Sequence, residues 1–179
     1  AQLGYGSFDT VRGKLAVSGP ISDSVKGSFS VLKQQRNKGW MTNRVDGSKV
    51  GENDFLGGLG TLAFGGDSFD ATLSLYASKA TSDGAYGSPV NVTTVKRVFA
   101  NESDIGSASV TVGGKKINPY NETKQHGADL IVSVPVGGFT LKSTTSYSKL
   151  QDDWAVDFTA GQLAAPAPVG PFDAIPGTS

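Results

Sequence analysis

Hydrophobic and polar residues alternate in two runs within Thr10–Arg36, and turn-forming residues separate the two runs. A period of two is typical of β-strands, because successive side chains of a strand point to opposite faces. In the first run Val11 falls on one face and Arg12 and Lys14 fall on the other. The pattern predicts a long antiparallel hairpin with one apolar and one charged face, with its turn at Gly19–Asp23.

The same pattern recurs along the chain and predicts seven strands and no helix. The strands are expected at Ala1–Gly6, in the two arms of the hairpin, and at Phe55–Phe64, Phe69–Ala80, Gly127–Val136 and Phe139–Leu150. Their apolar rows are Val11/Leu15/Val17, Val25/Phe29/Val31, Phe69/Leu73/Leu75 and Leu130/Val132/Val134. We expect a small additional hairpin between Val90–Phe99 and Ala108–Val112.

The predicted connections alternate between short and long. The short turns are Gly19–Asp23, Gly65–Ser68 and Gly137–Gly138; the long connections are Asn37–Asp54, Thr81–Gln125 and the segment after Gln151. In an up-and-down meander all short turns then lie at one end of the sheet and all long loops at the other. This asymmetry is typical of outer-membrane β-barrels. A sheet in water with one buried face remains the alternative.

Composition excludes several classes of function. The 179 residues contain no cysteine, so a disulfide framework and a thiolate metal site are excluded, and the formal net charge of zero argues against a nucleic-acid partner. The chain has no run of about 18 apolar residues that would form a transmembrane helix. His126, the only histidine, has no spaced partner for a metal site. With no signature of a nucleophile and base, we expect neither an enzyme nor a cofactor.

Short motifs between Ala1 and Ala80 resemble the early barrel strands of TonB-dependent receptors. The motifs are Gly4-Tyr5-Gly6, the acidic turn residue Asp9, Ser18-Gly19-Pro20-Ile21-Ser22-Asp23 and Gly39-Trp40-Met41-Thr42-Asn43. The segment NDFLGGLGTLAFGGDSFDATLSLYASKA is similar to the family's next hairpin. Beyond Ala80, the pattern of loop lengths and the strand Phe139–Tyr147 resemble the family. Leu59 departs from the pattern, because many members carry a basic residue there.

The resemblance implies an all-β fold, an antiparallel up-and-down meander of about seven strands that forms part of a large transmembrane β-barrel. Members of the family have about 22 strands and a plug domain in a Gram-negative outer membrane. They take up a scarce nutrient, often a ferric siderophore. The expected partners are outer-membrane lipid, the rest of the barrel and its plug, the TonB complex and a small nutrient ligand. The sequence contains neither a plug nor a TonB box, so we expect a fragment.

The resulting domain interpretation treats 1–179 as a partial barrel domain, 81–125 as a long extracellular loop and 155–179 as a truncated loop. Polar-face residues predicted to line the lumen are Arg12, Lys14, Lys26 and Lys142. Loop residues predicted to contact a ligand are Trp40, Arg44, Tyr86, Tyr120 and His126. The simpler alternatives are a solvated face of a soluble sheet and ordinary loop residues.

Aromatic residues near both ends of the predicted strands match the two girdles of a membrane barrel. Phe64, Phe69 and Phe139 adjoin the short turns, and Tyr5, Phe8, Trp40, Tyr147 and Trp154 lie near the long loops. Two other functions remain open at this point. One is a passive porin, and the other is a soluble or cell-surface β-sheet binding protein such as an adhesin.

Overall fold

Strands make up most of the computed structural model, which describes residues 1–66, 68–83, 90–91, 96–97, 104–105, 109–112 and 115–156. The chain divides into two units. The first unit comprises Ala1–Gln35, Asp54–Ala80 and Glu122–Asp152. The second comprises the described parts of Arg36–Asn53, Thr81–Asn121 and Asp153–Ser179. No helix in the described part of the chain is long and apolar enough to cross a membrane.

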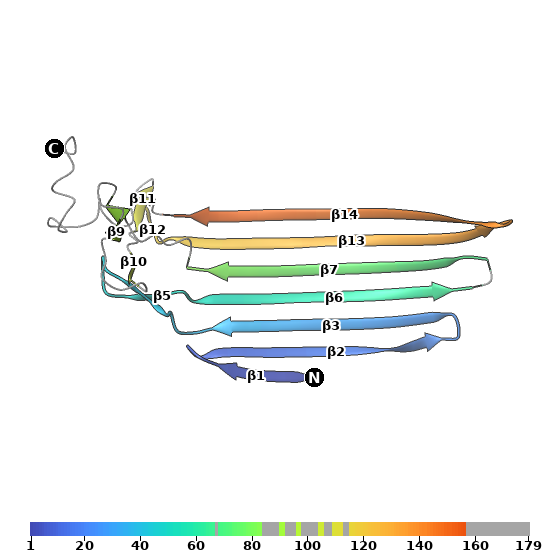
Figure 1. Cartoon of the computed structure of the whole chain (residues 1–179), viewed down its shortest axis with the longest axis horizontal. Helices are drawn as coiled ribbons and strands as arrows, with labels where there is room; N and C mark the ends of the chain where they lie inside the picture. Colours follow the sequence, from blue (N-terminus) through green and yellow to red (C-terminus); the bar gives the residue numbers. More distant parts are fainter. Residues whose placement is uncertain are drawn as a thin grey trace. The chain divides into compact units, whose positions relative to one another are not determined.

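A seven-stranded antiparallel sheet dominates the fold (Figure 1). Its strands are β1 (Gln2–Gly6), β2 (Thr10–Ser22), β3 (Val25–Arg36), β6 (Asn53–Gly65), β7 (Asp70–Ser82), β13 (Tyr120–Val136) and β14 (Phe139–Ala155). They are hydrogen-bonded in the order β1-β2-β3-β6-β7-β13-β14. The order of these seven strands in the sheet is therefore the same as their order along the chain. The predicted up-and-down meander of seven strands is confirmed.

Contacts between neighbouring strands determine which side chains share a face. A Cβ atom on Gly27 would meet the side chains of Ile21 and Leu62, whereas Thr61 Oγ1 lies 3.4 Å from Ser74 Oγ. Because side chains alternate along a strand, these contacts separate two faces. We call one the apolar face; it includes Val11, Leu15, Val17, Val25, Phe29, Val31, Leu56, Leu62, Phe64, Leu73 and Leu75. The opposite face, the polar face, includes Arg12, Lys14, Lys26, Ser28, Ser30, Thr61, Thr72, Ser74, Tyr76 and Ser78.

The two last strands extend both faces. A Cβ atom on Gly127 would meet the Tyr76 hydroxyl, which places odd-numbered β13 residues on the polar face and Leu130, Val132 and Val134 on the apolar face. The rings of His126 and Tyr147 lie with their centroids 6.3 Å apart, so the odd-numbered β14 residues belong to the apolar face. The apolar rows predicted from the sequence therefore lie on one face.

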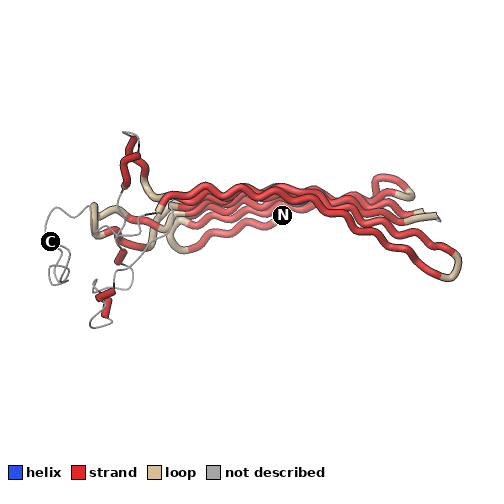
Figure 2. Tube along the Cα trace, turned by 90° about the horizontal axis from the view of Figure 1, so that it is seen from above, coloured by secondary structure: helices blue, strands red, loops and turns tan. Residues whose placement is uncertain are grey.

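The sheet is a single layer (Figure 2). Among the described residues Ile105 alone is a buried hydrophobic side chain, and it belongs to the second unit. On the sheet, Leu3 is 91% exposed and Phe139 is 84% exposed. A sheet with an apolar face needs a second layer or another apolar environment to cover that face. The first unit contains no such layer within its described residues.

Tight turns join several of the strands. Phe8 and Asp9 both have positive φ angles, of 60° and 51°, and the Tyr5 hydroxyl donates a hydrogen bond of 2.5 Å to Asp9 Oδ1. Gly137 and Gly138 form the two-residue turn that the sequence predicts. The turn predicted at Gly19–Asp23 is wrong in extent, because β2 continues through Ser22 and only two residues separate it from β3.

The strands also extend further toward the long connections than predicted. The expected loop Thr81–Gln125 is too long, because β7 ends at Ser82 and β13 begins at Tyr120. Two interactions extend this end of the sheet: Lys79 Nζ lies 2.6 Å from Glu122 Oε2, and Thr123 Oγ1 donates a 2.6 Å hydrogen bond to Asp152. Similarly, β6 begins at Asn53, two residues before the predicted start.

Short strands occupy the second unit. They are β4 (Met41–Asn43), β5 (Lys49–Val50), β8 (Val90–Asn91), β9 (Lys96–Arg97), β10 (Asp104–Ile105), β11 (Val110–Val112) and β12 (Lys115–Ile117). They pair as a three-stranded sheet β10-β4-β5 and two hairpins, β8–β9 and β11–β12. The predicted pairing of Val90–Phe99 with Ala108–Val112 is wrong, because each segment pairs locally instead.

Candidate functional site

The hairpin of β4 and β5 forms the ordered centre of the second unit. Asn43, which is 4% exposed, accepts a hydrogen bond of 2.8 Å from the Gly47 amide and donates its own amide to Ser48 O at 2.8 Å. The Arg44 amide donates to Ile105 O at 2.9 Å, which attaches β10 to the turn. Gly47 has a φ of 75°, a conformation that favours glycine. The Asp-Gly turn signal of the sequence therefore lies at the tip of a real hairpin.

Asp46 is held within this turn by its neighbour Ser48. Both the hydroxyl, at 2.6 Å, and the amide, at 2.9 Å, of Ser48 donate hydrogen bonds to Asp46 Oδ1. These bonds lower the pKa of the Asp46 carboxyl below its usual value, with the hydroxyl as the larger cause. The two hydrogen bonds to this carboxylate tie Asp46 to Ser48 across the turn.

Asp83 joins two chain segments that are distant in sequence. Its Oδ2 atom accepts hydrogen bonds from the amides of Gly51, at 2.7 Å, and Glu52, at 2.9 Å. Gly51 has a φ of 106°, and a Cβ atom there would lie 2.8 Å from Trp40 Cδ1. The indole of Trp40 thus packs directly on the backbone beside the Asp83 contact. This arrangement fixes the connection after β3 to the residue that follows β7.

A cavity of about 480 Å³ lies within the second unit. Its charged lining residues are Asp46, Lys49, Glu52 and Asp83, and Tyr120 adds a phenol. This lining offers hydrogen-bond donors and acceptors to a polar ligand but no nucleophile with a base. In the described part of the chain, no group of three or more His, Cys, Asp or Glu residues is placed to hold a metal ion.

The structure brings together only some of the loop residues expected to contact a ligand. Tyr120 lines the cavity, and Trp40, 45% exposed, packs near it on Gly51. Arg44 lies in the hairpin turn and is not part of the cavity lining. His126 lies on β13 opposite the ring of Tyr147, within a strand rather than a loop. Tyr86 lies outside the described residues.

Sequence reasoning missed the acidic side chains of the cavity as a group. Asp46 and Glu52 stand in an acidic run that lacks the spacing of a calcium loop. Asp83 is more than thirty positions away from the amides it binds, and no local pattern indicates that pairing. The Asp83-Gly84 pair signals only a turn. Aromatic and basic loop residues stand out in the sequence, but they form only a minor part of the cavity lining.

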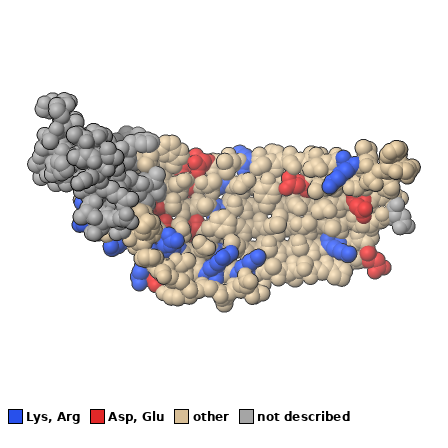
Figure 3. All heavy atoms as spheres, in the orientation of Figure 1, with Lys and Arg blue, Asp and Glu red and all other residues tan. Residues whose placement is uncertain are grey.

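On the polar face, the predicted wall residues are spread over several strands. Lys14 borders a hollow with Ser30 and Tyr76, and Lys26 borders another with Ser28 and Thr61. Arg12 also lies on the polar face, two residues before Lys14. Lys142 lies on the polar face too, because it is an even-numbered residue of β14. Figure 3 views one side of the molecule, on which basic and acidic groups are scattered along the strands. That these residues face a lumen stays a prediction.

Leu59 adds an apolar group to the polar face. It shares the face of Thr61 through the alternation of β6, is 43% exposed, and lines the same hollow as Lys14. Phe55 covers Gly57 on this face, since a Cβ atom on Gly57 would lie 2.8 Å from Phe55 Cζ. The hollow is therefore mixed in character, with a lysine on one side and apolar side chains on the other.

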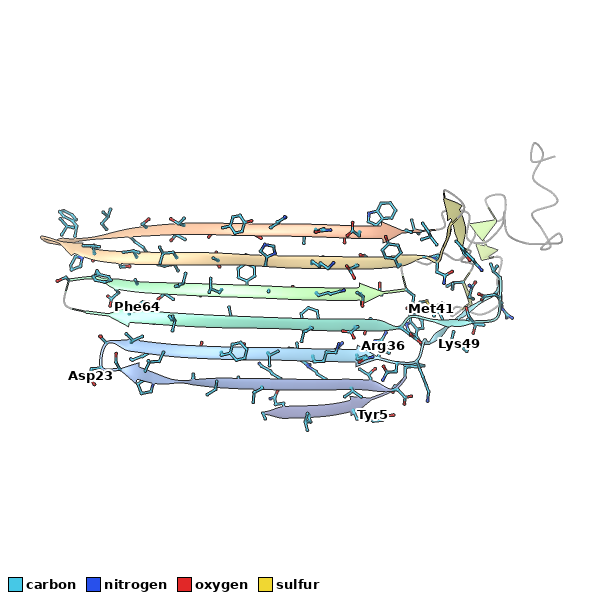
Figure 4. All side chains as sticks on the ribbon, turned by 180° about the vertical axis from the view of Figure 1, so that it is seen from behind. Tyr5, Asp23, Arg36, Met41, Lys49 and Phe64 are labelled. Atoms are coloured by element: carbon cyan, nitrogen blue, oxygen red, sulfur yellow. The ribbon has the colours of Figure 1, made fainter. Side chains whose placement is uncertain are left out.

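Charged residues mark one boundary of the apolar face. Starting from the short turns, apolar-face positions are uncharged until Lys33 on β3, Asp54 on β6, Lys79 on β7 and Lys124 on β13. Lys33 forms a salt bridge with Asp54. We call the uncharged part the apolar band. In Figure 4 the labelled Asp23 and Phe64 lie at the end of the sheet with the short turns, and Tyr5 lies at the opposite end.

Two solved structures are similar to this chain. The siderophore receptor PiuA from Acinetobacter baumannii has a TM-score of 0.62 and 18% identity, over 85% of this chain and 21% of its own. The ferric yersiniabactin uptake receptor FyuA from Yersinia pestis has a TM-score of 0.61 and 19% identity, over 83% of this chain and 22% of its own. Neither a family model nor a curated protein sequence matches.

The likeness establishes the fold. This chain spans about a fifth of the length of both solved structures. At this level of identity, the shared feature is the arrangement of the strands, and the sheet has the fold of a section of these receptors. The predicted all-β antiparallel fold and its resemblance to receptor barrels are confirmed at that level.

Proposed function

We propose that this chain is a section of the barrel wall of a TonB-dependent receptor in a Gram-negative outer membrane, and that the whole protein takes up a ferric siderophore. The single observation that carries the proposal is the apolar band, a face that no second layer covers on a single-layer sheet whose fold matches a section of two siderophore receptors. The proposed membrane position gives that face an apolar environment.

The length of the apolar band fits the core of a membrane. On β6 it runs from Phe64 to Leu56, a span of eight residue-to-residue steps or roughly 26 Å along the strand. On β13 it runs from Val136 to His126, a span of ten residue-to-residue steps or roughly 33 Å. With the usual tilt of about 40°, these lengths correspond to roughly 20–25 Å along the membrane normal, close to the apolar belt of outer-membrane barrels.

The second unit supports the ligand-binding part of the proposal. Its segments are the long connections after β3 and β7, and in barrels of this class the longer loops are extracellular. The cavity lined by Asp46, Lys49, Glu52, Asp83 and Tyr120 presents polar groups to such a ligand. Binding residues commonly lie on loops that a rigid scaffold positions. We therefore assign ligand contact to this unit and transport to the complete barrel.

The test uses the full-length protein that contains this chain, produced in the outer membrane of a host without siderophore receptors of its own. We expect added ferric siderophore to restore growth under iron limitation, and only when the TonB complex is active. Energy coupling is required because uptake of a scarce nutrient runs against its gradient. The measurement is growth, together with accumulation of radioactive iron, in paired strains with and without TonB.

Two outcomes would overturn the proposal. Permeation of small solutes that is independent of TonB, with no siderophore-dependent growth, would identify a passive porin. Purification of the protein as a monomer in buffer without detergent would identify a soluble β-sheet protein.

A further inference from the structure

The apolar face of the sheet is hollowed at one place. The hollow has a volume of about 690 Å³ and lies over β6, with β3 on one side and β7 on the other. Its apolar walls and floor are formed by Phe29, Val31, Gly58, Gly60, Leu75 and Ala77. A Cβ atom on Gly60 would have no atom within 4 Å, so the hollow exists because side chains are missing there. The surrounding rows of larger side chains make it a distinct groove.

A basic group borders this hollow on the side of the long connections. Lys79 lines it, two positions beyond Ala77 on the same face of β7. Glu122 Oε2 lies 2.6 Å from Lys79 Nζ, and Glu122 Oε1 forms a salt bridge with Lys124. Two ammonium groups therefore flank the Glu122 carboxylate at this rim, whereas the nearby Lys33 pairs with Asp54. The Lys79 side chain is 50% exposed, so it is accessible from outside the sheet.

We propose that this hollow binds one acyl chain of an anionic, phosphate-bearing membrane lipid, whose phosphate contacts Lys79. The inference rests on the proposed function, because it requires the apolar face to lie in a membrane. An apolar groove with a positively charged group at one end complements a lipid with an apolar tail and a negative headgroup. The end that carries Lys79 is also the boundary of the apolar band, where headgroups would lie.

Matched variants test the contact with the acyl chain and the contact with the phosphate separately. Gly60→Leu fills the groove, and Gly19→Leu is its control, because Gly19 lies on the apolar face of β2 with open space around it. Lys79→Gln removes the charge at the rim, and Lys142→Gln is its control on the polar face. Gly60 and Gly19 do not have a positive φ, so leucine fits the backbone at both positions.

Binding is measured on the delipidated full-length protein in a neutral detergent. Native mass spectrometry follows titration with phosphatidic acid, and with phosphatidylcholine as the zwitterionic comparison. We expect Gly60→Leu to weaken binding of phosphatidic acid at least tenfold, and Lys79→Gln to weaken it about fivefold and reduce its sensitivity to salt. Both controls should match the unmodified protein, and phosphatidylcholine should bind more weakly than phosphatidic acid.

Equal binding by Gly60→Leu and Gly19→Leu would overturn the proposal, as would equal affinity for the two lipids. Concentration-dependent dimers that Gly60→Leu abolishes would assign the hollow to a second copy of the chain and would overturn it too. Growth on ferric siderophore, measured with the same variants, keeps the two proposals distinct. Growth without specific lipid binding contradicts the lipid site alone, and lipid binding without growth contradicts the uptake proposal alone.

Discussion

Single glycines determine the backbone at several critical points of this chain. At Gly51 the φ of 106° and the proximity of Trp40 both exclude a larger residue. At Gly127 a Cβ atom would lie 2.4 Å from the carbonyl oxygen of Tyr147, so β13 and β14 approach closely there. At Gly137 the limit is conformational alone, because φ is 59° and open space surrounds the residue. Glycine is therefore favoured at these three positions for three different physical reasons.

The turn between β13 and β14 allows the conformational effect to be measured by itself. A positive φ at the first central residue is the pattern of a type II′ hairpin turn, which favours glycine there. We expect Gly137→Ala to lower the free energy of unfolding by about 1–2 kcal/mol, because a side chain is disfavoured in the left-handed region. Urea titration of the full-length protein in lipid vesicles measures the change.

Gly138→Ala is the matched control for this prediction. Gly138 also has open space around it, but its φ is not positive. We expect its effect to be within about 0.5 kcal/mol, as for an ordinary surface substitution. Equal losses at both positions would contradict the assigned turn geometry.

At the scale of elements, the period-two pattern predicts the strands wherever one face is apolar. The pattern fails where both faces are polar, as in the first residues of β13. Glu122, Thr123 and Lys124 have the composition of a loop, yet they extend a strand. Their partners Lys79 and Asp152 lie about thirty to forty positions away, and local sequence carries no signal of such pairs.

Turn formers caused the opposite error at the end of β2. Gly19 and Pro20 indicate a turn, whereas the structure continues the strand through Ser22. The candidate site, too, is only partly predictable from local sequence. Trp40 and Tyr120 stand out in the sequence as aromatic loop residues, but the contact of Asp83 with the Gly51 and Glu52 amides depends on tertiary structure. Local pattern predicts elements, and long-range pairs determine where they end.

Opposite faces of one strand should respond differently to the same charge. Leu73 lies on the apolar face of β7, and its neighbour Thr72 lies on the polar face. We expect Leu73→Arg to lower the free energy of unfolding in lipid vesicles by about 2–4 kcal/mol, the cost of a basic residue at the centre of a bilayer. Thr72→Arg should cost less than about 1 kcal/mol. Similar losses for the two variants, measured by urea titration, would contradict the assignment of the faces.

At the scale of the whole molecule, the described sheet has two open edges. β1 and β14 each pair with one neighbour in the described sheet. A membrane cannot satisfy open backbone groups, so sheets that cross it close into barrels. Under our proposal, further strands pair with both edges, in keeping with the chain matching about a fifth of each similar receptor. The structure of the wall and the chemistry of its two faces are then this section's contribution to uptake.

The most direct test of the membrane-wall account is to measure whether lipid or water surrounds each face of β7. The chain contains no cysteine, so single cysteines at positions 71–78 can each carry one spin label in the full-length protein in lipid vesicles. Collision rates with oxygen, which concentrates in lipid, are compared with those for a water-soluble nickel chelate. We predict a period of two, with high oxygen and low nickel accessibility at Ala71, Leu73, Leu75 and Ala77 only. High nickel accessibility at these four positions, or no period of two, would contradict the account.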